Sequence, residues 1–161
     1  MLTKEAIADQ WLGRVLRTYP GQTAGFLADQ KDEFRNPIGH TFRQGLAILL
    51  DELLLGMDAG RVRAALDSIV QIRAVEGGTP GHALEFLFQL KTILRSHALE
   101  TELELLNSRI DEMALLAFDL YTQYRERTFQ ARANEARRRV FVLERRFRPG
   151  EQDAWQERGA Q

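Results

Sequence analysis

The sequence of 161 residues contains no cysteine, only 4 prolines and 12 glycines. Without cysteine the chain cannot form a disulfide, a thiolate metal site or a thiol nucleophile. Proline and glycine are scarce, whereas alanine, leucine, glutamate, glutamine and arginine are frequent, and these residues lose the least conformational entropy in a helix. The composition therefore predicts an all-α protein whose chemistry does not depend on thiols.

Long apolar runs are also missing from the sequence. No stretch reaches the ~18–20 residues that a membrane-spanning helix needs, and the first six residues lack the charged-then-apolar pattern of a secretory signal. With 44% hydrophobic and 28% charged residues, the chain nevertheless has enough apolar side chains for a buried core. We expect a cytoplasmic protein with no membrane insertion.

The motifs of common enzyme classes are absent as well. The sequence has no GxSxG, GxGxxG or GxxxxGK[ST] motif, so hydrolase, dinucleotide-binding and P-loop functions lack their residues. Paired acidic residues such as Asp51-Glu52 and Asp111-Glu112 are sequence neighbours, and neighbours point in different directions from a helix. We predict no catalytic residues and no metal site, and hence no enzyme.

The three histidines lie on three different predicted helices, without the spacing of a metal site. A haem needs only one axial histidine in an apolar pocket, so a globin-like haem or small-ligand sensor is an alternative function. His40 and His82 fall in the first turns of predicted helices, where polar side chains are commonly solvated. The sequence therefore favours a protein with no cofactor. The phenylalanines that a haem pocket would use are Phe42, Phe86, Phe88 and Phe118.

Start and stop signals divide the chain into five or six helices. Asn36-Pro37 and Thr79-Pro80 each place a capping residue directly before a proline, as at many helix N-termini. Thr3 and Asp58 are two further candidate caps, and the apolar residues between the signals recur with a period of 3.6. The predicted helices span residues 4–18 and 23–31, Pro37 to Gly56 and Asp58 to Gly77, and a further helix begins at Pro80. This last helix is apolar nearly all round, so we expect it to lie at the centre of the fold.

From about residue 98 no proline or glycine occurs before Pro149, which predicts a long C-terminal helix. Eight apolar positions along it step by 4 and 3 residues, the 3.5-residue period of a coiled coil. Beyond Ala131 this pattern meets Arg138 and ends. Leu115 and Phe118 add apolar surface beside the seam, so the helix should pack on the body and on a partner helix. The predicted dimer or partner interface is Leu99, Leu103, Leu106, Ile110, Met113, Ala117, Leu120 and Tyr124.

The net charge of -1 hides an uneven distribution. Residues 131–148 hold seven arginines and only two acidic residues, which is typical of a solvated helix end or of a surface for an anionic partner. Nucleic-acid binding is a third, disfavoured hypothesis, because coiled-coil DNA readers carry the basic region before the zipper. We expect a helical body over 1–131, a basic extension over 132–148 and a disordered tail over 149–161. The candidate anion contacts are Arg137, Arg138, Arg139, Arg145 and Arg146.

Several short runs, in the right order along about residues 8–139, resemble the N-terminal domain of RsbRD-type RsbT co-antagonist proteins. The runs are Thr18-Tyr-Pro, Phe34-Arg-Asn-Pro-Ile-Gly, Gly45-Leu-Ala-Ile-Leu-Leu-Asp-Glu-Leu-Leu, Ile72-Arg-Ala-Val, Thr79-Pro-Gly-His-Ala-Leu-Glu-Phe-Leu-Phe-Gln-Leu-Lys, Ser108-Arg-Ile-Asp-Glu-Met-Ala-Leu-Leu-Ala-Phe-Asp-Leu-Tyr and Asn134-Glu. None of these runs is a catalytic signature.

The resemblance implies an all-helical sensory or scaffolding module, globin-like but without haem, that dimerises and passes a signal through its last helix. In stressosome relatives this domain precedes a STAS domain, which engages a switch kinase. We expect no such domain here, because residue 161 leaves no room for about 100 further residues. Kinase binding and threonine phosphorylation are therefore assigned to no residue, and a separately encoded STAS-type protein becomes the expected partner.

Overall fold

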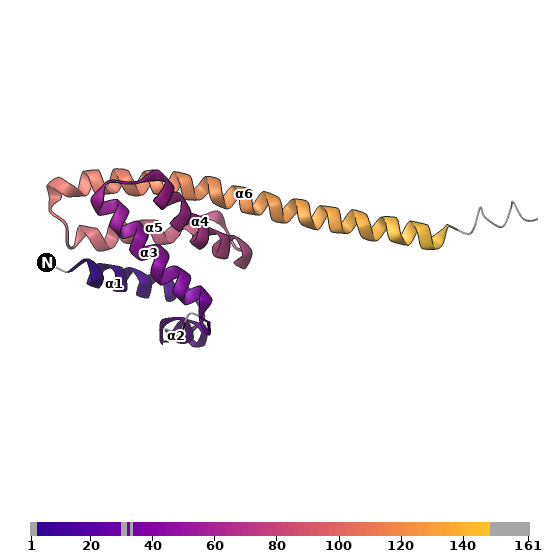
Figure 1. Ribbon diagram of the computed structural model, residues 1–161, viewed down its shortest axis with the longest axis horizontal. Helices are drawn as coiled ribbons and strands as arrows, with labels where there is room; N and C mark the ends of the chain where they lie inside the picture. Colours follow the sequence, from indigo (N-terminus) through magenta and orange to yellow (C-terminus); the bar gives the residue numbers. More distant parts are fainter. Residues whose placement is uncertain (1–2, 30–31, 33, 149–161) are drawn as a thin grey trace, which may run out of the picture. The chain divides into compact units, whose positions relative to one another are not determined.

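A computed structural model describes residues 3–29, 32 and 34–148, and every regular element in this part of the chain is an α-helix. The helices, shown in Figure 1, are α1 (Lys4–Leu16), α2 (Gly21–Asp29), α3 (Pro37–Leu55), α4 (Ala59–Glu76), α5 (Pro80–Arg95) and α6 (Glu100–Phe147). The all-α class and the long C-terminal helix are thus confirmed. The predicted tail over 149–161 and the end of the predicted second helix, 30–31, lie outside the described residues.

Four capping residues begin helices where the sequence predicts them. Thr3, Asn36, Asp58 and Thr79 each precede a helix, and each side-chain oxygen accepts a hydrogen bond from the backbone N–H three residues later, at 2.8–3.3 Å. These bonds satisfy donors that have no partner inside the helix. The starts of α1, α3, α4 and α5 are therefore set by local chemistry.

Asn36 also connects two helices. While its side-chain oxygen caps α3, its Nδ2 donates to the carbonyl of Leu27 in α2 at 2.9 Å, and the residue is buried. A Cβ atom at Gly39 would lie 2.2 Å from Asn36 Nδ2, closer than any side chain tolerates. Glycine at position 39 is thus required for Asn36 to hold the end of α2 against the start of α3.

The core lies among α1, α3, α4 and α5, with the first half of α6 along them (Figure 1). Trp11 of α1 stacks on Phe86 of α5 with ring centroids 6.2 Å apart, and its indole N–H donates to the Phe86 carbonyl at 2.7 Å. A Cβ at Gly45 of α3 would lie 2.8 Å from Ile69 Cδ1 of α4, so glycine lets these two helices cross closely. Large apolar side chains therefore fill the core, and α3 packs closely on α4 where Gly45 faces Ile69.

The chain divides into two compact units, the first ending at Tyr124 and the second beginning at Arg125. The boundary falls within α6, which is one continuous helix from Glu100 to Phe147. The two parts of this helix differ in their surroundings, and both carry residues that the sequence analysis singled out.

Candidate interaction surfaces

The predicted coiled-coil seam of α6 faces the chain's own core. Leu103 and Tyr124 are half-buried against that core, and Leu99 is exposed. The central residues are buried among core residues of the same chain. These central residues are Leu106, Ile110, Met113, Ala117 and Leu120.

Hydrogen bonds hold the same part of α6 on the other helices. Arg109 Nη1 donates to the carbonyl of Leu53 at the end of α3 at 2.5 Å, and the Tyr124 hydroxyl bonds to Asp67 Oδ1 of α4 at 2.8 Å. The central seam residues are therefore covered within one folded chain. The dimer or partner interface predicted at this seam stays a prediction, which the burial of its central residues does not favour.

A second apolar face of α6 lies beside α5 and is open to solvent. Phe88 is 49% exposed, Phe118 50% and Leu115 70%. The exposure of Leu115 and Phe118 agrees with the predicted apolar surface beside the seam. The helix α5 is central as predicted, with most of its apolar residues buried, but Phe88 lies on its exposed side. Together with neighbouring residues they line a shallow groove of about 520 Å³, which we call the α5–α6 face. Its lining is Pro80, Gly81, Leu84, Phe88, Asp111, Ala114, Leu115 and Phe118.

The charged groups at the edge of the α5–α6 face neutralise each other. Lys91 Nζ lies 2.6 Å from Asp111 Oδ1 and 5.7 Å from the centre of the Phe88 ring. The ion pair joins α5 to α6 and leaves the face apolar, with a neutral edge. Such a face can meet another apolar surface without bringing like charges together.

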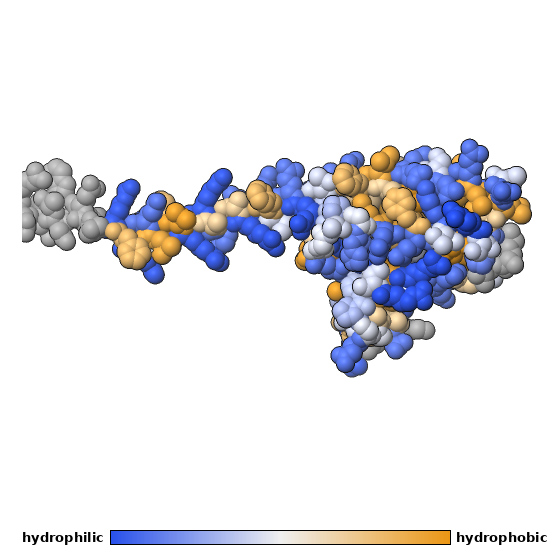
Figure 2. Space-filling model, turned by 180° about the vertical axis from the view of Figure 1, so that it is seen from behind, coloured by the Kyte–Doolittle hydropathy of each residue, from blue (hydrophilic) through white to orange (hydrophobic). Residues whose placement is uncertain are grey.

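The second part of α6 carries a different surface. From Arg125 to Arg148 every residue is exposed or only partly buried. Six apolar residues step along it by 4, 3, 4, 3 and 4 positions, and Figure 2 shows apolar side chains along this part of the helix with hydrophilic ones on both sides. Phe129 is 73% and Phe147 80% exposed. We call this set the C-terminal stripe: Phe129, Ala133, Ala136, Val140, Leu143 and Phe147.

The sequence analysis missed the C-terminal stripe because it followed a single register. From Tyr124 the register of the first seam continues to Arg127 and Ala131 and then, through Asn134, reaches Arg138. The stripe begins at Phe129, displaced from that register, but it keeps the same 3.5-residue period. Testing each register separately beyond Tyr124 would have found it.

The five predicted arginines do not share one face of α6. At 100° per residue, Arg139 and Arg146 lie beside the C-terminal stripe on one side and Arg137 on the other. Arg138 and Arg145 lie on the opposite face of the helix. Their role as anion contacts stays a prediction. Arg132, which the prediction omitted, joins Arg139 and Arg146 in a row with seven-residue spacing.

The phenylalanines of the haem hypothesis lie in two different environments. The His82 side chain is half-exposed and lies 3.5 Å from Glu85. Phe42 and Phe86 are fully buried in the core, whereas Phe88 and Phe118 are half-exposed on the α5–α6 face. Their placement gives the haem hypothesis no support.

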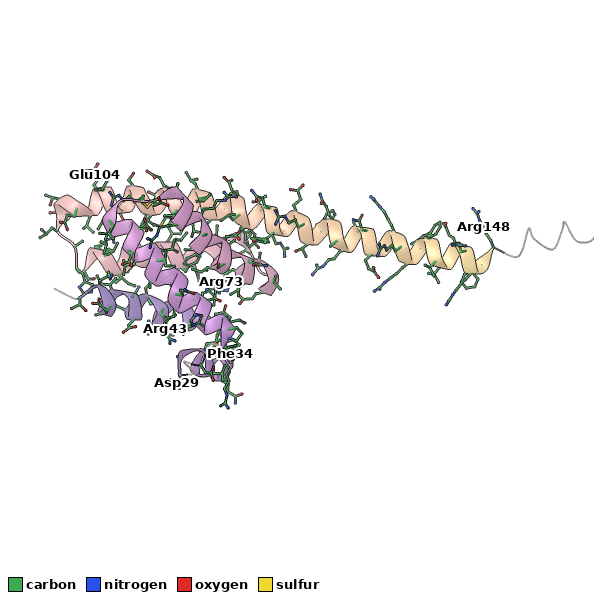
Figure 3. The ribbon with its side chains drawn as sticks, viewed as in Figure 1. Asp29, Phe34, Arg43, Arg73, Glu104 and Arg148 are labelled. Carbon is green, nitrogen blue, oxygen red and sulfur yellow. The ribbon has the colours of Figure 1, made fainter. Side chains whose placement is uncertain are left out.

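A buried arginine, which the sequence analysis did not identify, joins α1, α3 and α4. Arg73, which is labelled in Figure 3, is 2% exposed. Both of its terminal nitrogens lie 3.2 Å from Thr18 Oγ1. Its guanidinium carbon is 5.2 Å from the centre of the Tyr19 ring and 5.5 Å from that of Phe42. Burial, followed by a hydrogen bond to Glu76, raises the pKa of Tyr19. Because its members face one another inside the bundle, this cluster supports the fold.

Within the described part of the chain, no helix is both long enough and apolar enough to cross a membrane. The same residues contain no group of three or more histidine, cysteine, aspartate or glutamate side chains that could hold a metal ion. The features that stand out on the surface are the α5–α6 face and the C-terminal stripe. These features define a helical module with two exposed apolar surfaces.

The chain belongs to the family described as the RsbT co-antagonist protein rsbRD N-terminal domain, which matches residues 5–136. The match confirms the resemblance found in the sequence. It identifies a regulatory domain and no known catalytic family. No curated protein and no solved structure matches the chain.

Proposed function

We propose that this chain is a non-enzymatic signalling module that forms a homodimer through its α5–α6 face and acts by binding other proteins. The observation that carries the proposal is the exposure of three large apolar side chains, Phe88, Leu115 and Phe118, on one face of the folded body. Contiguous exposed apolar residues of this kind mark interaction sites more often than chance scatter does.

The electrostatics of the α5–α6 face suit pairing with a second copy. A two-fold dimer places the same patch of both chains in contact, so an unpaired charge near the two-fold axis would meet the same charge of the second copy. Here Lys91 and Asp111 already neutralise each other at 2.6 Å. Phe88 and Phe118 would occupy the centre of the interface, where a few aromatic residues usually carry most of the binding energy.

Light scattering coupled to size exclusion tests this dimer. We expect the full chain to have twice its chain mass of 18.5 kDa, and Phe118→Asp to have the mass of one chain. Phe118 is half-exposed, so the variant should keep its helical circular dichroism.

Phe129→Asp is the matched control, because Phe129 is an exposed phenylalanine of the same helix outside the α5–α6 face. It should remain dimeric. A monomeric wild-type chain, or a dimeric Phe118→Asp variant, would contradict the proposed interface.

The signalling partner is, in our proposal, a STAS-domain protein. Two things support this: the resemblance to stressosome relatives, in which a STAS domain follows this one, and the family description of an RsbT co-antagonist. Mixing the full chain with the STAS-domain proteins of the same genome and measuring the mass of the eluted species tests it. A stable complex is the expected result, and unchanged masses with every such protein would reject this partner.

A further inference from the structure

We propose that the C-terminal stripe binds an amphipathic helix of another protein, and that acidic residues flank the apolar seam of that helix. The stripe consists of exposed or partly buried residues on a helical segment in which the structure shows no buried residue. The proposal goes beyond the homodimer and does not depend on it, because it concerns different residues.

The width of the stripe favours a helix as the occupant. At 100° per residue its six members fall within an arc of roughly 80°, which matches the narrow seam of a coiled coil. A helix that lies in a membrane surface has a broader apolar face. Figure 2 shows hydrophilic side chains on both sides of these apolar ones. A second helix can cover so narrow a strip completely.

The charges beside the stripe disfavour a second copy as the occupant. Arg132, Arg139 and Arg146 follow one edge, while Arg137 and Glu144 follow the other. In a parallel pair of copies, the heptad pattern places Arg132 of each chain against the second copy's Arg137, which repels it, and Arg139 against the second copy's Glu144, which attracts it. In an antiparallel pair the arginine edges of both chains face each other. The antiparallel arrangement is therefore repulsive and the parallel one gains no net attraction, whereas a helix with acidic flanks attracts every arginine of the row.

Small residues in the middle of the stripe also disfavour a second copy as the occupant. Ala133 and Ala136 occupy two successive layers. In a parallel pair of copies each alanine would face another alanine, and these layers would bury little apolar area. An unlike helix with leucine at those levels fills the space, since large side chains pack best opposite small ones.

The sign of the charge specifies the partner. Residues 125–148 hold nine arginines and three glutamates, a net charge of +6. Along one edge the arginines recur every seven residues, so a partner with glutamate or aspartate at the same interval can meet all three. The row therefore selects an acidic amphipathic helix over a basic one.

Two synthetic helical peptides provide the test on the full chain. Both have three heptads with leucine at the seam positions, and the flanking positions are glutamate in one and lysine in the other. Fluorescence anisotropy should show that the glutamate peptide binds at least about tenfold more tightly than the lysine peptide, a preference that salt weakens.

Three variants separate the stripe from other surfaces. Val140→Asp should weaken binding of the glutamate peptide by roughly 30-fold or more, the effect of losing a central apolar contact. Val75→Asp is its control, because Val75 is an exposed valine of α4. Replacing Arg132, Arg139 and Arg146 together by glutamate should reverse the preference toward the lysine peptide. Phe118→Asp should bind the glutamate peptide like wild type, so the dimer and this proposal can fail separately.

Four results would overturn the proposal. Neither peptide binds, or both bind equally well. Alternatively, Val140→Asp halves the mass of the chain in light scattering, which would place a second copy on the stripe. Finally, vesicles containing an anionic lipid bind the chain through Val140 and the glutamate peptide does not displace them, which would make the stripe a membrane-binding surface.

Discussion

The two parts of α6 share a helix and a 3.5-residue apolar period, but they have opposite environments. Before Tyr124 the seam, with Ile110 and Met113 at its centre, is buried in the core of its own chain. After Arg125 the C-terminal stripe is exposed or partly buried. A heptad period therefore shows that an apolar face exists on a helix, but it does not show what covers that face.

Their polar contacts differ in the same way. Arg109 and Tyr124 in the first part bond to α3 and α4, whereas Arg139 in the second part pairs with Glu135 of its own helix at 3.0 Å. Isolated helices are only marginally stable in water, because most helix stability in proteins comes from packing of an apolar face. The second part would therefore gain most of its stability from a bound partner.

The largest expected contrast between the two parts comes from placing the same charge on each apolar face. Ile110→Asp should lower the free energy of unfolding by at least about 4 kcal/mol, since it removes a buried side chain and buries a carboxylate. Val140→Asp should change it by less than ~0.5 kcal/mol, because the side chain is in solvent. Urea denaturation followed by circular dichroism measures both. Equal losses in the two variants would mean that both faces are covered in the free chain.

A smaller contrast is expected for two arginines of α6. Arg109→Met should lower the free energy of unfolding by about 1–2 kcal/mol. The reason is that the Leu53 carbonyl loses the partly buried hydrogen bond that Arg109 donates to it. Arg139→Met should cost at most a few tenths of a kcal/mol, since its ion pair with Glu135 is exposed. Thermal unfolding of the two variants checks this, and a larger loss for Arg139→Met would break the comparison.

The smallest expected effect is a pH dependence of the free energy of unfolding. It arises from Tyr19, which lies in the first part of the chain. The pKa of Tyr19 is raised above its ordinary value of 10.0 in the folded chain, so the folded state holds the phenol proton more tightly than the unfolded state does. The stability from this difference is complete below about pH 10 and is lost as the pH rises above it. Between about pH 9 and pH 11 the free energy of unfolding should fall more steeply for wild type than for Tyr19→Phe. Parallel curves in urea titrations would show that Tyr19 does not contribute.

Much of the fold could be predicted from local signals. Thr3, Asn36, Asp58 and Thr79 were identified as caps from their positions alone, and the structure shows each of them bonding to the N–H three residues later. The long last helix followed from the lack of proline and glycine before Pro149. A cap bonds within one helical turn, and the absence of helix-breaking residues can be seen along the chain. Both features can therefore be predicted from the order of the residues.

The candidate surfaces could be predicted only in part. Phe88 belongs to a helix that is apolar nearly all round, so periodicity could not tell which side stays exposed. An arginine such as Arg73 is expected on the surface. The residues that surround it in the structure, Thr18, Tyr19 and Phe42, are far from it in the sequence, so its burial could not be predicted. The stripe from Phe129 was visible in principle, yet it required a change of register.

The sequence by itself determined where the helices begin, that they are apolar on at least one side, and that charge is concentrated after Arg125, because each depends on neighbouring residues. The tertiary structure decided which apolar faces are buried and which stay exposed. One seam of α6 meets the core, the α5–α6 face stays open, and the C-terminal stripe is exposed or partly buried within the described part of its own unit. Burial is a property of residues brought together from far apart, and no local pattern contains it.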